Sequence, residues 1–193
     1  MGVINLDYKQ KFQMWLDSDY FDKKTINELR SIKNNDDEIK ERFYKDLEFG
    51  TGGMRGIIGA GTNRINIYTI RKATQGLADF IINNVEKSQR SFAIAFDSRL
   101  LSKEFAREAS IVLNANGIKT YLFGQLHPTP VLSFAVRFLK CCGGIVITAS
   151  HNPKEYNGYK VYWNDGAQVV SPIDNEIVEC VNRIESFNQV KLI

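Results

Sequence analysis

The chain has 193 residues, of which 44% are hydrophobic, and its formal net charge at pH 7 is +3. This length suits one sizeable domain with a real core, because single domains commonly contain about 100 to 200 residues. The small positive excess is dispersed and forms no stripe with interleaved aromatic residues, which argues against a nucleic-acid partner. No segment reads as a signal peptide or a membrane span, and the three cysteines are an odd number without metal-ligand spacing. We therefore expect a cytoplasmic protein with no membrane partner.

The first part of the chain is predicted to be helical. Apolar residues recur at helical spacing over residues 6–16 and 25–32, and acidic residues begin a third helix over residues 36–44. We expect these helices to form an N-terminal extension, residues 1–46, that packs on a domain formed by residues 47–193.

Strands and helices alternate in the remainder of the chain. We expect strands at residues 57–58, 92–96, 118–123, 145–148 and 159–163, and helices at 69–85, 102–116, 130–140 and 172–184. Ser102 is expected to cap the helix that it begins, and Gly117 to end it. The alternation predicts an α/β fold with a mixed, mostly parallel sheet between helices.

A hydroxyl, an imidazole and an ammonium group lie close together in the sequence around two of these strands. Ser150 and His151 follow the strand at 145–148, and Lys160 lies on the strand at 159–163. Turn signals of the Asn-Pro and Asn-Gly type separate the two strands. Loops at strand ends are the usual place for ligands in α/β sheets, so this loop is the first candidate for a site.

Ser150 allows three interpretations. A Ser-His-Asp hydrolase has little support, because no Gly-x-Ser-x-Gly elbow surrounds Ser150 and the chain contains only two histidines, His127 and His151. A serine that carries a phosphoryl group fits better, since nearby cations would offset the phosphate charge and a metal could bind one of its oxygens. An ordinary surface turn is the third interpretation. The residues next to Ser150 do not by themselves decide between the last two.

The glycine-rich segment at residues 49–61 has the composition of a phosphate-binding loop. Glycines allow backbone N–H groups to approach an anion closely, and Arg55, the only charged residue of the segment, could bind phosphate through two parallel donors. The segment lacks the spacing of a P-loop and of a dinucleotide fingerprint, and a plain glycine-rich bend remains an alternative. A further polar triplet, Asp97-Ser98-Arg99, directly follows the strand at 92–96.

Together these segments resemble the first domain of the α-D-phosphohexomutases. The matching segments occur in the same order and cover nearly the whole chain: Gly50 to Gly56 (GTGGMRG), Asp97 to Arg99 (DSR), Thr148 to Pro153 (TASHNP) and Asn157 to Lys160 (NGYK). The hexapeptide around Ser150 is highly specific, whereas the other segments are supporting signals. Within the superfamily, Trp15-Leu16, Tyr20 to Asp22 and the form FGTGG resemble the phosphoglucomutase and phosphopentomutase-like branch.

The resemblance implies a role for each matching residue. Ser150 would carry the phosphoryl group, donate it to a sugar monophosphate and bind Mg²⁺ through its phosphate. Arg55, His151 and Lys160 would assist proton transfer and charge stabilisation, with the division among them open. Phosphate or substrate would be bound by Thr51, Gly52, Gly53, Arg55, Arg99 and Asn152. The reaction would interconvert sugar 1-phosphate and sugar 6-phosphate through a bisphosphate of the glucose 1,6-bisphosphate type.

The resemblance also implies parts that this chain does not contain. Members of the superfamily have four domains, and the later three supply an Asp-rich Mg²⁺ loop, a sugar-specificity loop and a further phosphate-binding loop. We therefore expect this chain to be inactive alone and to have the remaining domains of a longer polypeptide, with a sugar phosphate, as its partners. Phosphoglucomutase is the first choice of activity, followed by phosphomannomutase and phosphopentomutase. The alternative is a non-catalytic module that binds sugar phosphates.

Overall fold

A five-stranded mixed sheet forms the centre of the protein. The computed structural model describes residues 6–192, so residues 1–5 of the expected extension and residue 193 of the expected domain lie outside the described residues. The strands are β1 (Gly53–Ile57), β2 (Ser91–Phe96), β3 (Lys119–Leu122), β4 (Gly143–Ile147) and β5 (Tyr156–Trp163), in the order β1-β5-β4-β2-β3. β2 pairs in parallel with β3 and β4, whereas β5 pairs antiparallel with both β4 and β1. Four strands therefore share one direction, which confirms the mixed α/β prediction.

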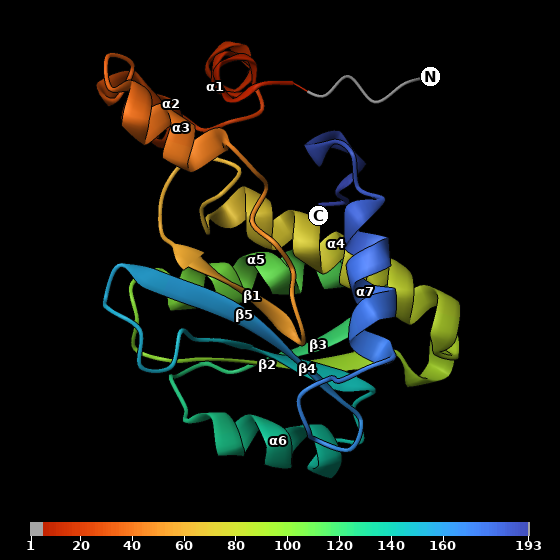
Figure 1. Ribbon diagram of the computed structural model, residues 1–193. Helices are drawn as coiled ribbons and strands as arrows, with labels where there is room; N and C mark the ends of the chain where they lie inside the picture. The colour runs from red at the N-terminus through yellow and green to blue at the C-terminus, as the bar shows by residue number, and fades with distance from the viewer. Residues whose placement is uncertain (1–5, 193) are drawn as a thin grey trace.

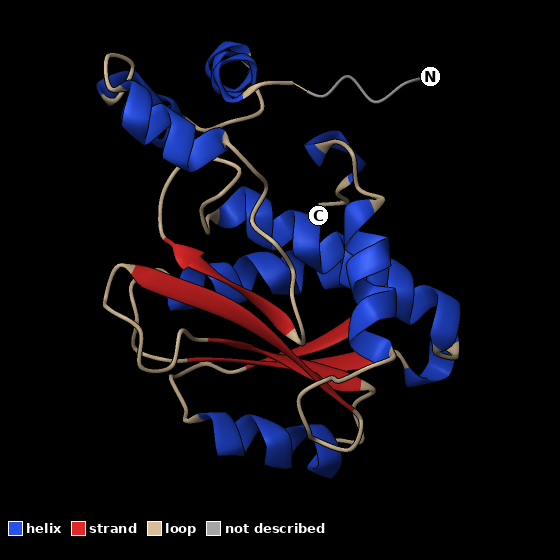
Figure 2. Cartoon of the chain, in the orientation of Figure 1, coloured by secondary structure: helices blue, strands red, loops and turns tan. Residues whose placement is uncertain are grey.

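Helices cover the two faces of this sheet. α4 (Ile67–Asn84) and α5 (Ser102–Ala115) lie on one face, and α7 (Ile173–Asn182) packs against α4 (Figures 1 and 2). α6 (Thr129–Phe138) lies on the opposite face, against β2 and β4. Short 3₁₀ turns occur at Lys87–Gln89 and Phe187–Gln189.

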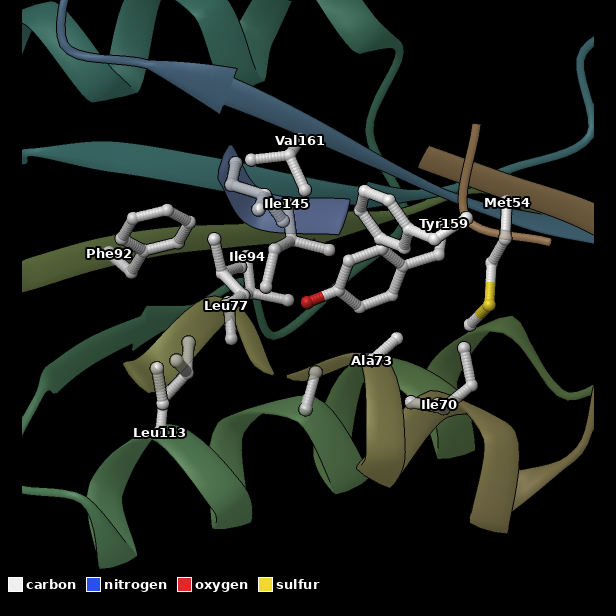
Figure 3. Close-up of a cluster of buried hydrophobic side chains, with 14 of the residues drawn as sticks. Met54, Ile70, Ala73, Leu77, Phe92, Ile94, Leu113, Ile145, Tyr159 and Val161 are labelled. Atoms are coloured by element: carbon white, nitrogen blue, oxygen red, sulfur yellow. The ribbon is translucent and has the colours of Figure 1, made fainter. Parts of the chain in front are cut away.

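The larger core lies between the sheet and helices α4 and α5 (Figure 3). Tyr159 and Val161 of β5 point into this core. Because side chains alternate along a strand, Lys160 and Tyr162 face the other side, toward α6. Burial raises the pKa of the Tyr159 phenol, and its oxygen accepts a 3.2 Å hydrogen bond from Thr74 of α4.

The N-terminal helices form a separate aromatic cluster on the domain. They are α1 (Tyr8–Asp17), α2 (Lys23–Ser31) and α3 (Asp36–Phe43), and each begins with a side-chain cap, from Asp7, Asp22 and Asn35 respectively. Trp15 stacks on Phe21 with ring centroids 4.0 Å apart. The same cluster contains Tyr68, so these three helices pack directly on α4.

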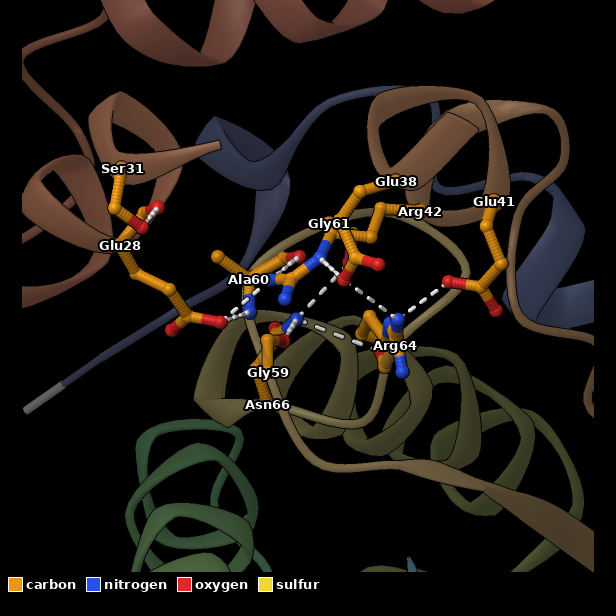
Figure 4. A network of polar contacts seen from close by, with 10 residues as sticks. All are labelled: Glu28, Ser31, Glu38, Glu41, Arg42, Gly59, Ala60, Gly61, Arg64 and Asn66. Atoms are coloured by element: carbon orange, nitrogen blue, oxygen red, sulfur yellow. Dashed lines mark hydrogen bonds and ion pairs between the residues drawn. The ribbon is translucent and has the colours of Figure 1, made fainter. Parts of the chain in front are cut away.

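A network of charged groups joins the extension to the loop after β1 (Figure 4). Arg42 pairs with Glu28 at 2.5 Å and with Glu38 at 2.8 Å, and it also donates to the carbonyl of Ala60 at 3.2 Å. Gly61 has a φ of 131°, and a Cβ there would lie 2.8 Å from the carbonyl oxygen of Arg42. The second half of the glycine-rich segment therefore allows the close approach of Arg42.

Two local predictions need correction. Ser102 is the first helical residue of α5, and Leu101, with a φ of 61°, occupies the capping position without a side-chain hydrogen bond. The Ser102 hydroxyl instead donates to Asp97 at 2.8 Å. The first strand begins at Gly53, earlier than the predicted strand at 57–58, because pairing with β5 outweighs the low strand propensity of glycine.

Candidate active site

Ser150 lies on a tight turn just beyond the carboxyl end of β4. Its side chain is exposed, and its φ of 56° is left-handed, a conformation that residues other than glycine rarely adopt. The backbone N–H of Ser150 donates to the hydroxyl of Thr148 at 3.0 Å. A left-handed non-glycine residue persists only where the surrounding structure holds it, and such residues concentrate at functional sites.

Arg55 reaches this turn from β1, the strand at the edge of the sheet. Its guanidinium donates to the side-chain oxygen of Asn152 at 2.7 Å. Arg55 pairs with Gly158 across the β1–β5 ladder, and Gly158 accepts the Thr148 N–H at 3.0 Å. The sheet order therefore brings a cation from the first strand beside the loop that carries Ser150, residues 148–156, called here the serine loop.

His151 and Lys160 are placed differently with respect to the serine. His151 Nδ1 lies 3.4 Å from Ser150 Oγ, a long separation for a hydrogen bond, and both side chains are exposed. Lys160 is partly buried on β5, opposite Val146 of β4 and Gly53 of β1. In residues 6–192, no hydrogen bond joins Lys160 to the serine loop.

The predicted phosphate-binding residues Thr51 to Gly53 form a turn at the start of β1. Gly50 and Gly53 exchange two backbone hydrogen bonds, of 2.7 and 3.0 Å, and Gly52 has a φ of 74°. The Gly52 carbonyl accepts from the N–H of Val161 at 2.9 Å. This turn lies away from Ser150, because the other end of β1 is the one paired with the start of β5. Its role in phosphate binding stays a prediction.

The side chain of Arg99 packs against the serine loop and donates hydrogen bonds to its backbone carbonyls. The two Nη atoms donate to the carbonyls of Ser150 (2.8 Å), Asn152 (2.6 Å), Pro153 (2.9 Å) and Tyr156 (3.1 Å). A phosphate contact through the Nη atoms of Arg99 would require the side chain to give up at least one of these carbonyls.

Asn157 is a residue whose contribution the sequence reasoning missed. Its Asn-Gly context indicates only a turn, yet Asn157 is fully buried within β5. Its amide nitrogen donates to the Leu100 carbonyl and to the Ser102 hydroxyl, both at 2.9 Å. An asparagine at the start of an apolar strand was the available signal, because a buried amide needs partners from another segment.

A surface hollow of about 420 Å³ lies between the loop that follows β2 and the serine loop. It is lined by residues 97–100 together with Ser150, Asn152 and Lys154. The hollow is bordered by the exposed Ser150 and by Asn152, whose side chain accepts from Arg55, and this arrangement suits the transfer of an anionic group.

The described residues do not make a complete Mg²⁺ site. Residues 6–192 contain no group of three or more His, Cys, Asp or Glu side chains suited to a metal. Asp97 lines the hollow, but one of its oxygens already accepts from the N–H of Arg99 and from the Ser102 hydroxyl. Mg²⁺ prefers about six oxygen ligands, so this part of the chain could supply only one or two.

Among the helices in residues 6–192, none has the length and apolar character needed to cross a membrane.

Residues 46–188 match the model of the family "Phosphoglucomutase/phosphomannomutase, alpha/beta/alpha domain I". The chain is 39% identical over 184 residues to phosphopentomutase of Homo sapiens, and the aligned region covers 89% of this chain and 29% of the relative. It is 43% identical over 145 residues to phosphoglucomutase of Staphylococcus haemolyticus, covering 75% of this chain and 26% of the relative.

A solved structure shows the same fold. A Thermus thermophilus protein assigned as a phosphomannomutase superposes with a TM-score of 0.65 at 32% identity, over 71% of this chain and 30% of that one. The chain thus spans less than a third of the length of these relatives. Taken with the order of its strands and the match over residues 46–188, the chain belongs to the phosphoglucomutase/phosphomannomutase family and carries its α/β/α domain I.

Proposed function

We propose that this chain is the domain that carries the phosphorylated serine of a sugar-phosphate phosphomutase. The observation that carries the proposal is the conformation of Ser150, whose left-handed backbone presents an exposed hydroxyl at the end of β4, beside the Arg55–Asn152 pair. Since the chain spans less than a third of its relatives, the remaining domains would belong to the same longer polypeptide.

In the proposed reaction, a hydroxyl of the sugar monophosphate attacks the phosphorus of phosphorylated Ser150, so that a new O–P bond forms and the Oγ–P bond breaks. The proton that the sugar hydroxyl loses is balanced by the proton that Ser150 Oγ gains as it becomes a hydroxyl again. The resulting sugar bisphosphate then reorients in the site, and its other phosphoryl group is transferred to Ser150. Phosphoryl transfer depends mainly on positioning and on stabilisation of charge. Mg²⁺, when bound to the serine phosphate, would neutralise part of that charge.

The residues beside Ser150 divide these tasks. We assign charge stabilisation of the phosphoryl group to Arg55, because a guanidinium suits the binding of phosphate oxygens better than the transfer of a proton. His151 lies 3.4 Å from Ser150 Oγ, and an imidazole exchanges protons readily near neutral pH. We assign the proton transfer to His151 or Lys160, with Lys160 reaching the phosphoryl group only when substrate is bound. Asn152 holds Arg55 in place.

The substrate proposed first is glucose 1-phosphate, with glucose 1,6-bisphosphate as the intermediate. The similarity to a phosphoglucomutase and to a phosphopentomutase supports glucose and pentose phosphates, and the structural neighbour supports mannose phosphates. A coupled assay of the longer polypeptide with each sugar 1-phosphate ranks them by kcat/KM.

The test is the location of the phosphoryl group in the polypeptide that naturally contains this domain. Incubation with glucose 1,6-bisphosphate, followed by intact-mass and phosphopeptide analysis, is expected to find one phosphoryl group on Ser150. Ser150→Ala should abolish this label. Ser98→Ala is the matched control, because Ser98 is an exposed serine in the same hollow, and this variant should keep the label.

Two results would contradict the proposal. Sugar phosphate that binds without ever labelling Ser150 would favour the non-catalytic binding module. Labelling of Ser150 by an organophosphate probe, with no transfer from a bisphosphate, would favour a hydrolase. Sequencing of the coding region beyond Ile193 tests the domain arrangement separately, since an Asp-rich loop in frame is expected there.

A further inference from the structure

We propose that Arg99 is a positioning residue that holds the serine loop, residues 148–156, in the conformation that presents Ser150, and that it does not bind the sugar phosphate itself. This inference rests on the proposed function, because a phosphoryl-carrying Ser150 is the group that is positioned. The geometry on which it depends can be tested without any catalytic assay.

Hydrogen bonds to the serine loop occupy all four Nη donors of the Arg99 guanidinium. A guanidinium has five N–H donors in a planar fork. The four on the Nη atoms point to carbonyls of the serine loop, at 2.6 to 3.1 Å. The fifth, on Nε, faces the carboxylate of Asp97 at 3.6 Å. A phosphate oxygen could bind the Nη atoms of Arg99 only by displacing one of these carbonyls, which would then lack its partner, and a phosphate at Nε would meet the negative charge of Asp97.

Arg99 is itself anchored from its own segment. Only 15% of its side chain is exposed. Asp97, which faces its Nε, accepts from the Ser102 hydroxyl at 2.8 Å and from the Arg99 backbone N–H at 3.0 Å. Ser102 begins α5, so the anchor is continuous with a buried helix. The position of Arg99 is therefore set by a rigid element outside the serine loop.

A second connection joins residues 97–102 to the end of the serine loop. Asn157 is fully buried, and its amide donates to the Leu100 carbonyl and to Ser102. The serine loop is thus fixed to residues 97–102 both along its length, through Arg99, and at its end, through Asn157. The conformation of the loop depends on this segment, which lies about 50 residues earlier in the chain.

The four hydrogen bonds from Arg99 to the serine loop, called here the clamp, directly affect Ser150. The carbonyl of Ser150 is one of the four that Arg99 binds, and the φ of this residue is 56°. Without a donor on that carbonyl, the loop can relax toward the ordinary right-handed or extended regions, which moves Oγ. A displacement of about 1 Å at a reacting atom can reduce the rate about 100-fold. Lysine cannot replace the planar fork, because its single ammonium bonds fewer of the carbonyls at once.

The first experiment measures backbone hydrogen exchange in the 193-residue chain and requires no activity. Arg99→Met removes all five donors and keeps much of the side-chain volume. The reporters are the amides of Asn152 and Tyr156, which donate within the loop to Ala149 and Pro153 at 3.1 and 3.0 Å. We expect Arg99→Met to speed their exchange by about tenfold or more, as expected for local opening that the clamp suppresses.

Arg90→Met is the matched control. Arg90 also binds backbone carbonyls, those of Val85 (2.9 Å) and Ile82 (2.8 Å), but it lies before β2, at the opposite end of that strand from Arg99. This variant should leave exchange in the serine loop unchanged even if it lowers global stability. Equal loop exchange in wild type and Arg99→Met would overturn the proposal. Equal acceleration by Arg99→Met and Arg90→Met would do so as well.

The second experiment measures kinetics in the longer polypeptide. If Arg99 positions the loop, Arg99→Met should lower kcat about 100-fold with little change in KM, and Arg99→Lys should restore only a small part of the rate. A rise in KM with kcat preserved, or full rescue by Arg99→Lys, would show direct phosphate binding and overturn the proposal. If the wild-type enzyme shows no transfer at all, the proposed function fails, while the exchange data still decide whether Arg99 holds the loop.

Discussion

Arg55 and Asn152 are 97 positions apart in the sequence, and the guanidinium of Arg55 donates a 2.7 Å hydrogen bond to the amide oxygen of Asn152. Because an amide oxygen carries no net charge, this contact fixes the arginine beside Ser150 without cancelling its positive charge. A carboxylate at the same place would hold the arginine equally well but would neutralise it. The neutral partner is therefore the one suited to a site that receives a phosphoryl group.

Asn152→Asp tests this relationship. The new carboxylate would pair with Arg55 and place a negative charge next to Ser150, where it repels the incoming phosphoryl group. We expect phosphorylation of Ser150 by glucose 1,6-bisphosphate to slow by about tenfold or more, which corresponds to about 1.4 kcal/mol. A mass-spectrometric time course measures the rate. Asn164→Asp, at an exposed turn after β5, is the control, and equal rates in the two variants would refute the argument.

Arg42→Met should weaken the attachment of the N-terminal extension. The Arg42 side chain is only 13% exposed, and its removal leaves Glu28 and Glu38 without their shared partner. We expect the free energy of unfolding to fall by about 2 to 3 kcal/mol, measured by urea denaturation with hydrogen exchange in α1 to α3. Arg183→Met is the control: its pair with Glu179 is long, at 3.7 Å, and 73% of its side chain is exposed. A similar loss in both variants would count against a specific role of the network.

Gly53→Ala should displace β1 from β5. Gly53 has a φ of 153°, and a Cβ at this position would lie 1.9 Å from the carbonyl oxygen of Tyr159. We expect the free energy of unfolding to fall by about 3 kcal/mol. Gly124→Ala serves as the control, because a Cβ there meets nothing within 4 Å, and its stability should be unchanged or slightly raised. Urea denaturation of the two variants measures the difference, and equal midpoints would contradict the prediction.

Asp22→Asn should flatten the acid dependence of stability. Partial burial acts to raise the pKa of the Asp22 carboxyl, but hydrogen bonds from the Thr25 N–H (2.8 Å) and the Tyr68 hydroxyl (3.0 Å) hold the pKa below its usual range. A lowered pKa in the folded state adds stability above the unfolded value of about 3.9, and this stability is lost as the pH falls through the folded pKa. Urea unfolding from about pH 6 to about pH 2 should show a steeper loss below about pH 4 in the wild type than in Asp22→Asn. Parallel curves would show that Asp22 does not contribute.

The predictions that held depended on local patterns. The helices over residues 25–32 and 36–44 followed from apolar periodicity and acidic starts, and α2 and α3 lie within about two residues of them. The strand before Ser150 followed from its β-branched residues, which are buried in β4. These patterns are readable because each depends only on neighbouring residues.

The predictions that failed depended on distant partners. Ser102 was predicted to cap the helix, but its hydroxyl donates a hydrogen bond to Asp97, and Leu101 occupies the N-cap position. Gly53 looked like part of a loop, but pairing with Lys160 makes it the start of a strand. In both cases a contact across the fold outweighed the local preference.

By itself, the sequence determined the α/β class and the loop that carries Ser150, because alternation and turn residues act over a few positions. Only the tertiary structure decided which groups each arginine contacts. β1 and β5 become neighbours through an antiparallel pairing of segments about 100 residues apart, and this pairing places Arg55 beside Asn152. The position of residues 97–102 under the serine loop likewise directs Arg99 to backbone carbonyls. Such contacts depend on strand order in the sheet, which no local pattern of residues records.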